Sequence, residues 1–309
     1  MWKISSGVFL GWSLGANDSA NIFGTGVATG TIKYRTAIWL TAVFVMIGAL
    51  LEGPRCMKTI NALAAIDPMA AFCCTLAAGL TIAALTFFSI PASVSQAIVG
   101  TIVGAGLLAG HVDLSLLYKV VACWLFTPVL SIVLGYVTYR VIEQILNRTV
   151  KSLTRRNLIY FWGILIAGCY GAYSLGANNV ANVTGVYVNA GVLLPLAASV
   201  IGGLSIAFGA VTYSKRVMMT VGKGIVPLDP FSAFVVVLAE AMTLHLFTQL
   251  GVPVSSSQAV VGAVVGVGLV GGLRTVSLRM LAFIGIGWVM TPVAAGLIAV
   301  GLLFGIRFI

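Results

Sequence analysis

Long apolar segments separated by short polar turns follow one another along almost the whole chain. A helix that crosses a bilayer needs about 20 predominantly apolar residues, and ten segments come close to that length or exceed it. The pattern therefore predicts an all-α polytopic membrane protein. The segments are residues 4–31, 36–52, 67–89, 91–110, 114–142, 158–189 and 195–213, and three more that begin at 229, begin at 253 and contain 288–292.

One polar stretch occurs twice inside these apolar segments. Residues 13–21 (SLGANDSAN) return as residues 174–182 (SLGANNVAN), identical at seven of nine positions at an offset of 161. The chain is therefore predicted to be a duplication, with a first repeat at 1–146, a basic cytoplasmic linker at 147–157 and a second repeat at 158–309. Three further pairs keep the register: Asp67-Pro68 with Asp229-Pro230, the serine stretches 91–96 and 253–258, and the Thr-Pro pairs at 127–128 and 291–292.

The number of segments in each repeat predicts the topology. Each half holds five segments, and because five is odd, the two repeats should insert in opposite orientations. If two segments in each half are re-entrant hairpins, three crossings remain and the inversion persists. Two inverted-topology repeats, with broken or re-entrant helices that meet at the midplane, are typical of transporters.

Composition and charge agree with a membrane protein and predict its orientation. The chain is 60% hydrophobic and 8% charged, whereas soluble domains carry about 25% charged residues. The net charge of +10 comes from basic residues in short loops, where they orient a chain in the bilayer. An outside N-terminus leaves most of them inside, so both termini are predicted outside a cell membrane. The exceptions are Lys3, Arg55, Lys58, Lys119 and Arg307.

The duplicated polar stretch places glycine, amide and carboxylate groups at membrane depth. Because Gly, Asn and Asp weaken a helix interior, we expect an interruption at Gly15–Asp18 and another at Gly176–Asn179. Oxygen ligands of this kind suit a hard cation such as Na⁺, or a proton. The alternative role is hydrogen bonding between helices, but the duplication favours a site. The candidate cation ligands here are Asn17, Asp18, Asn21, Asn178, Asn179 and Asn182.

The serine stretches are a second duplicated feature. Proline followed by serines predicts a helix start, and the unpaired N–H groups there, with the positive end of the helix dipole, favour an anion. Two such starts related by inversion can converge on one tetrahedral oxyanion. Ordinary capping is the alternative for each stretch alone. The candidate anion ligands are Ser93, Val94, Ser95, Gln96, Ser255, Ser256, Ser257 and Gln258.

Two acids lie inside apolar segments, Asp18 and Glu240, and intramembrane acids are functional by default. Glu240 joins the candidate cation ligands, and its mirror position holds Ala78, which makes the site asymmetric in charge. Since these segments hold almost no Lys or Arg, an anion must be neutralised by helix dipoles, hydroxyl and amide donors, and co-bound cations. That requirement favours cation-coupled symport. His245 receives no role.

Enzyme chemistry has little support in the sequence. The Gly-x-Gly spacings lie inside apolar segments, and no Walker-type phosphate loop occurs, so ATP-driven transport is unsupported and no cofactor is expected besides the coupling ion. An intramembrane hydrolase is the alternative of another class, but no serine can be paired with a base. We therefore expect no enzyme. A passive anion channel is a further alternative.

The residues at 15–21 and 176–182 resemble the paired signature of the inorganic phosphate transporter (PiT) family, and the Pro-x-Ser-x-Ser pattern of the serine stretches resembles its second paired motif. The resemblance covers nearly the whole chain. It implies a sodium- or proton-coupled phosphate symporter that works by alternating access between inverted repeats. Sulfate or another oxyanion is the alternative substrate, and interfacial Trp and Gly-rich faces permit a homodimer.

The resemblance also implies residue roles. Asn17, Asp18, Asn178 and Asn179 would act in cation and phosphate binding, the serines would hold phosphate, and Glu240 matches a glutamate that the family uses in transport. The chain departs from the family in two respects. It carries Val-Ser-Gln and Ser-Ser-Gln where relatives often carry Thr-Thr-His or Ser-Thr-His, and Ala78 stands where a glutamate is common.

Overall fold

The computed structural model describes residues 2–88, 92–224, 228–271 and 278–307, and these form helices joined by short turns, with no strand among them. Pro91 and Arg274 lie outside the described residues. The helices after a short turn at Trp2–Ile4 are α1 (Ser5–Ala28), α2 (Tyr34–Leu51), α3 (Gly53–Ala62), α4 (Pro68–Phe87), α5 (Val94–Ala109), α6 (Leu114–Thr149), α7 (Leu153–Asn189), α8 (Pro195–Tyr213), α9 (Lys215–Gly224), α10 (Pro230–Gln249), α11 (Ser256–Val270) and α12 (Leu278–Arg307).

Seven of these helices are long and apolar enough to span a membrane, and the chain is a multi-pass membrane protein. They are α2, α4, α6, α7, α8, α10 and α12. Helix α1 has 24 residues but carries the polar stretch, whereas α5 and α11 have only 16 and 15 residues. At 1.5 Å per residue, α5 and α11 are too short to cross the roughly 30 Å hydrocarbon core alone.

The predicted helix starts at the Asp-Pro pairs are confirmed. Asp67 accepts hydrogen bonds from the backbone amides of Met69 and Ala70 at 2.6 and 2.9 Å. Asp229 accepts one from Ser232 at 2.7 Å. In each case proline follows in the first turn, where its missing N–H removes no helical hydrogen bond.

The interruptions expected at Gly15–Asp18 and Gly176–Asn179 do not occur, because α1 and α7 run through both stretches as unbroken helices. The glycines serve close helix packing instead. A Cβ atom on Gly15 would lie 1.9 Å from the carbonyl oxygen of Ile206 in α8, and one on Gly176 would lie 2.0 Å from that of Val45 in α2. Since 45 and 206 are also 161 apart, the two crossings are equivalent, and each joins helices from opposite repeats.

The helix breaks lie instead between α2 and α3 in the first repeat and between α8 and α9 in the second. Helix α2 ends before Glu52 and α3 begins at Gly53, while α8 ends before Ser214 and α9 begins at Lys215. Pro54 lies in the first turn of α3, and a proline there would clash with the carbonyl four residues earlier if α2 continued. The sequence prediction missed α3 and α9 as separate helices.

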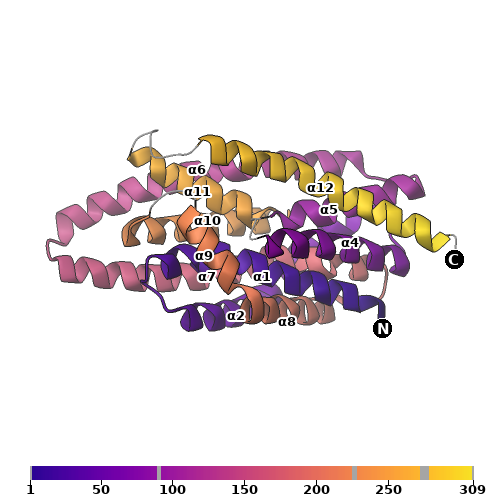
Figure 1. Cartoon of the computed structure of the whole chain (residues 1–309), viewed down its shortest axis with the longest axis horizontal. Coiled ribbons are helices and arrows are strands. Elements are labelled where there is room, and N and C mark those ends of the chain that lie inside the picture. The colour runs from indigo at the N-terminus through magenta and orange to yellow at the C-terminus, as the bar shows by residue number, and fades with distance from the viewer. Residues whose placement is uncertain (1, 89–91, 225–227, 272–277, 308–309) are drawn as a thin grey trace.

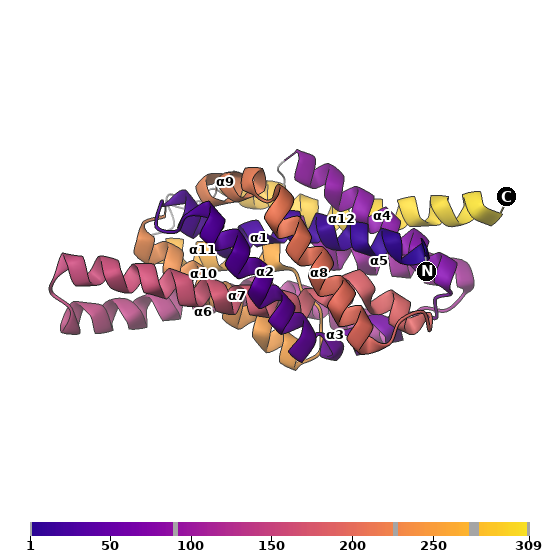
Figure 2. The same ribbon diagram turned by 90° about the horizontal axis from the view of Figure 1, so that it is seen from below.

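Two helical hairpins complete the inverted arrangement. The α4–α5 hairpin lies at the end of the molecule that holds both termini, and the α10–α11 hairpin lies toward the opposite end, near the α6–α7 turn (Figures 1 and 2). Each hairpin packs on a long helix of the other repeat. A Cβ atom on Gly100 would lie 2.2 Å from the carbonyl oxygen of Pro292, and one on Gly262 would lie 2.5 Å from that of Pro128.

Candidate functional site

The first asparagine of each polar stretch ties together the two arms of a hairpin. Asn178 Nδ2 donates to Thr248 Oγ1 at 3.0 Å, at the end of α10, and its Oδ1 accepts from the Val254 amide at 2.8 Å, before α11. Asn17 makes the equivalent bonds at the α4–α5 turn. Its Nδ2 donates to Thr86 Oγ1 at 2.9 Å, and its Oδ1 accepts from the Ala92 amide at 3.3 Å. Both asparagines therefore hold the hairpin turns in place.

The last asparagine of each stretch contacts the opposite repeat. Asn21 Nδ2 donates to Ser256 Oγ at 3.0 Å, and Asn182 Nδ2 donates to Ser95 Oγ at 2.8 Å. The two serines lie in the first turn of α11 and of α5, and the contacts are equivalent at the offset of 161. The polar stretches and the serine stretches, far apart in sequence, thus form one cluster.

The two serine-capped helix starts meet within this cluster. Ser95 Oγ donates to the Val254 carbonyl oxygen at 2.8 Å, which joins the start of α5 to the residues before α11. Ser93 accepts from the Gln96 amide at 3.3 Å, and Ser255 accepts from the Gln258 amide at 3.2 Å, as predicted for N-caps. Both helix starts bring the positive end of a helix dipole to the cluster.

The cluster is closed to solvent and holds polar atoms that lack a hydrogen-bond partner. Asp18 and Glu240 are each 1% exposed. A buried polar atom without a partner is unfavourable by about 1–3 kcal/mol, so a group of them indicates a place for a ligand. Within the part of the chain that the structure describes, these atoms include Asp18 Oδ1, Asn21 Oδ1, Asn182 Oδ1, Gln96 Oε1, Gln258 Oε1, Asn179 Nδ2 and both carboxyl oxygens of Glu240.

Two carboxyl groups lie in the cluster. Glu240 on α10 lies near enough to Asp18 on α1 for the two carboxyl groups to interact electrostatically. Neither acid forms an ion pair with a described basic residue, since the ion pairs found there join Arg140 to Glu143 and His245 to Glu52. Two close carboxyl groups in a low-dielectric interior favour a bound cation or a proton.

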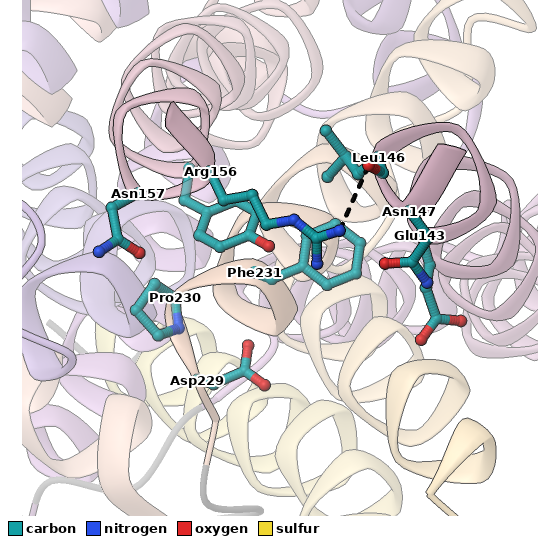
Figure 3. A pocket seen from close by; sticks show the side chains of 9 residues that line it. Glu143, Leu146, Asn147, Arg156, Asn157, Asp229, Pro230 and Phe231 are labelled. Atoms are coloured by element: carbon teal, nitrogen blue, oxygen red, sulfur yellow. Dashed lines mark hydrogen bonds between the residues drawn. The ribbon is translucent and has the colours of Figure 1, made fainter. Parts of the chain in front are cut away.

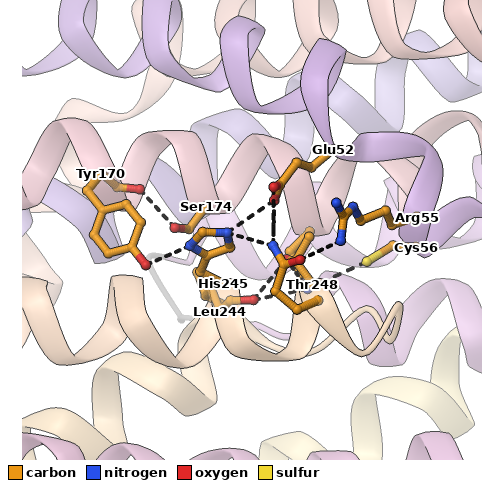
Figure 4. Close-up of polar contacts among 10 residues, drawn as sticks. Glu52, Arg55, Cys56, Tyr170, Ser174, Leu244, His245 and Thr248 are labelled. Carbon is orange, nitrogen blue, oxygen red and sulfur yellow. Dashed lines mark hydrogen bonds and ion pairs between the residues drawn. The ribbon is translucent and has the colours of Figure 1, made fainter.

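Sequence reasoning missed the hairpin threonines and a second polar network. Thr86 and Thr248 differ by 162 positions, so aligning the repeats could have paired them. The network joins His245 Nε2 to Glu52 Oε2 at 3.2 Å, and the Tyr170 hydroxyl to His245 Nδ1 at 2.7 Å (Figure 4). His245 thus has partners on α7 and at the break between α2 and α3, and the network continues through Gln249, which contacts Glu52 and Arg55 and directly follows Thr248.

A separate cavity of about 260 Å³ lies near the α6–α7 turn (Figure 3). Arg156 projects into it and is held by the carbonyl oxygens of Val150 at 2.8 Å and Leu146 at 3.3 Å. Glu143 and Asp229 also line it. None of the candidate ligands lines this cavity, so it is distinct from the buried cluster.

The model of the phosphate transporter family matches residues 14–165 and 147–299. A protein of Methanocaldococcus jannaschii named "Putative phosphate permease" is 30% identical over 93% of this chain and 91% of its own. The sulfate permease of Bacillus subtilis is 29% identical, over 85% of this chain and 75% of its own. The solved structure of a sodium-dependent phosphate transporter has a TM-score of 0.86 at 24% identity, covering 99% of this chain and 98% of the other.

Proposed function

Because this chain belongs to the phosphate transporter family, we propose that it takes up inorganic phosphate by symport with Na⁺ or H⁺. The observation that carries the proposal is the buried cluster in which two serine-capped helix starts meet two carboxyl groups. Such a site offers positive dipoles and donors to an anion and oxygen ligands to a cation. Coupled transport uses an anion site and a cation site together, whereas enzyme catalysis does not require this pairing.

In the proposed mechanism the cation binds first. Asp18, Glu240 and the nearby amide oxygens form its site, and Asn17, Asn178 and Asn182 position it. Phosphate then docks against the starts of α5 and α11, where serine hydroxyls and the glutamine side chains surround it. The bound cation supplies the positive charge that hydroxyl and amide donors lack, so the anion binds well only when the cation is present.

The hairpins supply the alternating access. The α4–α5 hairpin and the α10–α11 hairpin lie toward opposite ends of the molecule, and each packs on a helix of the other repeat. Movement of one repeat against the other would open the cluster first to one side and then to the other. With both termini outside, α4–α5 belongs to the outer entrance and α10–α11 to the inner one.

Uptake of radiolabelled phosphate into proteoliposomes tests the proposal, with an inward Na⁺ gradient, an inward H⁺ gradient, or neither. Accumulation above equilibrium in one gradient is expected and identifies the coupling ion. Equilibration without accumulation in every case would show a passive channel instead.

Sulfate is the second candidate substrate, and the similarity to the sulfate permease of Bacillus subtilis favours testing it. Phosphate carries protons at neutral pH that can be donated to acceptors such as Gln96 Oε1 and Gln258 Oε1, whereas sulfate does not. Excess unlabelled sulfate should therefore compete poorly with labelled phosphate. Strong competition, or labelled sulfate uptake without phosphate uptake, would assign the site to sulfate.

A further inference from the structure

The two halves of the buried cluster are equivalent in structure but differ in charge. The hydrogen bond from Asn21 to Ser256 is repeated as that from Asn182 to Ser95. Between these matched contacts, Asp18 of the first repeat is replaced by Asn179 in the second. Glu240, near Asp18, is likewise replaced at its mirror position by Ala78, which is fully buried. One half therefore carries two acids, and the other carries none.

The atoms of Asp18, Asn21 and Glu240 that lack a hydrogen-bond partner are all oxygen acceptors. Ser256 is hydrogen-bonded to both Asp18 and Asn21, so these two side chains converge on one hydroxyl. Asp18 Oδ1 and Asn21 Oδ1 lack partners, as do both carboxyl oxygens of Glu240, and all three side chains are at most 1% exposed. A set of charged and neutral oxygens without donors suits one hard cation.

The Asn179 half presents a donor instead. Asn179 Oδ1 accepts from Asn182 Nδ2 at 2.9 Å and lies 3.3 Å from Ser95 Oγ, whose one hydrogen atom goes to the closer Val254 carbonyl oxygen at 2.8 Å. The bond from Asn182 identifies Oδ1 as the acceptor of this amide, and its Nδ2 is left buried without a partner. An N–H group disfavours a cation and suits an oxyanion oxygen. Asn182 Oδ1 is the remaining acceptor in this half, and it is uncharged.

We propose that the two equivalent positions have different roles. Asp18, Asn21 and Glu240 hold a single coupling cation, while Asn179 Nδ2 donates a hydrogen bond to the transported oxyanion, so that one cation accompanies each anion. This inference rests on the proposed symport function, and it adds the number of cations and the direction of the Asn179 hydrogen bond.

The number of cations can be measured from the coupling of the two gradients. Proteoliposomes clamped at zero potential are given graded inward gradients of the driving cation, and the logarithm of steady-state phosphate accumulation is plotted against the logarithm of the cation gradient. A slope of one is expected for the wild type, and a slope of two would overturn the proposal.

Asn179→Asp restores a carboxylate to the second half and should raise the slope toward two, whereas an unchanged slope contradicts the assignment. Asn157→Asp adds the same charge at an exposed position of α7 and should leave the slope at one.

A second variant covers failure of Asn179→Asp to fold. Asn179→Ala removes the donor and should raise the KM for phosphate by roughly tenfold, the effect of losing one hydrogen bond to a charged group. The slope should stay at one, and the cation concentration for half-maximal uptake should change by less than about twofold. A loss of cation affinity as large as the loss of phosphate affinity would place Asn179 in the cation site and overturn the inference.

Failure of the proposed function is separable from failure of this inference. If the wild type transports no phosphate in any gradient, binding of radiolabelled Na⁺ to the detergent-solubilised protein still decides the point. One Na⁺ per chain, lost in Asp18→Asn and retained in Asn179→Ala, supports a single cation site. Two Na⁺ per chain overturns it, as does the absence of both Na⁺ binding and proton uptake by the wild type.

Discussion

Asn178 accepts a hydrogen bond from the backbone amide of Val254 at 2.8 Å, and with its own amide it holds Thr248 on the other arm of the same hairpin. Asn17 bonds Ala92 and Thr86 in the same way. A single side chain thus fixes each hairpin turn at the point where the two serine-capped helix starts meet. These asparagines position the site, whatever further contact they make with an ion.

The first prediction concerns this bridge. Asn178→Ala leaves the Val254 amide without its partner inside the protein and removes one of the two hydrogen bonds of the Thr248 hydroxyl, which still donates to the Leu244 carbonyl oxygen at 2.8 Å. We expect the free energy of unfolding to fall by about 2–4 kcal/mol, since an unsatisfied buried amide is unfavourable by about 1–3 kcal/mol and a lost hydrogen bond contributes about 1 kcal/mol more. Denaturant titration in detergent micelles measures the loss. Thr248→Val is the control, because it keeps the Val254 bond and should lower stability by only about 1 kcal/mol. Equal losses in the two variants would contradict the bridging role.

The second prediction concerns the glycine crossings. In Gly15→Ala the new methyl group would lie 1.9 Å from the Ile206 carbonyl oxygen, so α1 and α8 must separate. Overpacking of this kind lowers stability by about 1–3 kcal/mol, and thermal unfolding followed by size-exclusion chromatography should show it. Gly301→Ala on α12, where a Cβ atom meets nothing within 4 Å, should leave the midpoint unchanged. A stable Gly15→Ala protein would show that the crossing tolerates a larger separation.

The third prediction concerns the charge of the cluster. Asp18→Asn keeps the shape of the side chain but removes the negative charge that the proposed cation needs. Coupled uptake should fall to background in proteoliposomes, while the thermal unfolding midpoint stays close to that of the wild type. Glu143→Gln is a suitable control, because it removes one acid that faces solvent beside Arg140. Near-normal accumulation by Asp18→Asn would refute the proposed cation site.

The fourth prediction concerns the network around His245. His245 and Glu52 have side chains that are 29% and 16% exposed, and partly exposed ion pairs contribute at most about 1 kcal/mol. His245→Gln should therefore reduce stability by less than about 1 kcal/mol, clearly less than Asn178→Ala on the neighbouring hairpin turn. Denaturant titration of both variants side by side makes the comparison. A larger loss in His245→Gln would make this network the stronger tie between α10 and the break at Glu52.

The sequence predicted those features that depend on local chemistry. Asp67 and Asp229 each precede a proline, and an acidic cap followed by a proline has one common outcome, a helix start. The serine stretches were predicted as helix starts for the same reason, and Ser93 and Ser255 are caps. The duplication also predicted that the two halves would be equivalent, and the paired contacts of Asn21 and Asn182 keep that register.

Contacts between the repeats could not be predicted in this way. Beside Asn17 and Asp18, Gly15 was interpreted as a helix breaker. Glycine can either weaken a helix or let another backbone approach it closely, and the local sequence is the same in both cases. Which of the two applies depends on Ile206, almost two hundred residues later in the chain. The break at Glu52 was missed because the residues between the predicted segments 36–52 and 67–89, which include Pro54, were assigned to no helix. The threonines that hold the asparagines are unremarkable in sequence and are identified only by what they touch.

The pairing of α1 with α8 has a consequence for biogenesis. Helix α1 is completed at Ala28, but its glycine-matched neighbour begins only at Pro195. At about 5–20 residues per second, the ribosome needs roughly 8–30 s to reach that neighbour. During this interval the amides and carboxylate of α1 must be shielded by the insertion machinery or remain near the bilayer surface. A nascent chain released after its first half would expose a helix whose amides and carboxylate lack their partners in the second repeat, which makes it a natural substrate for membrane quality-control proteases.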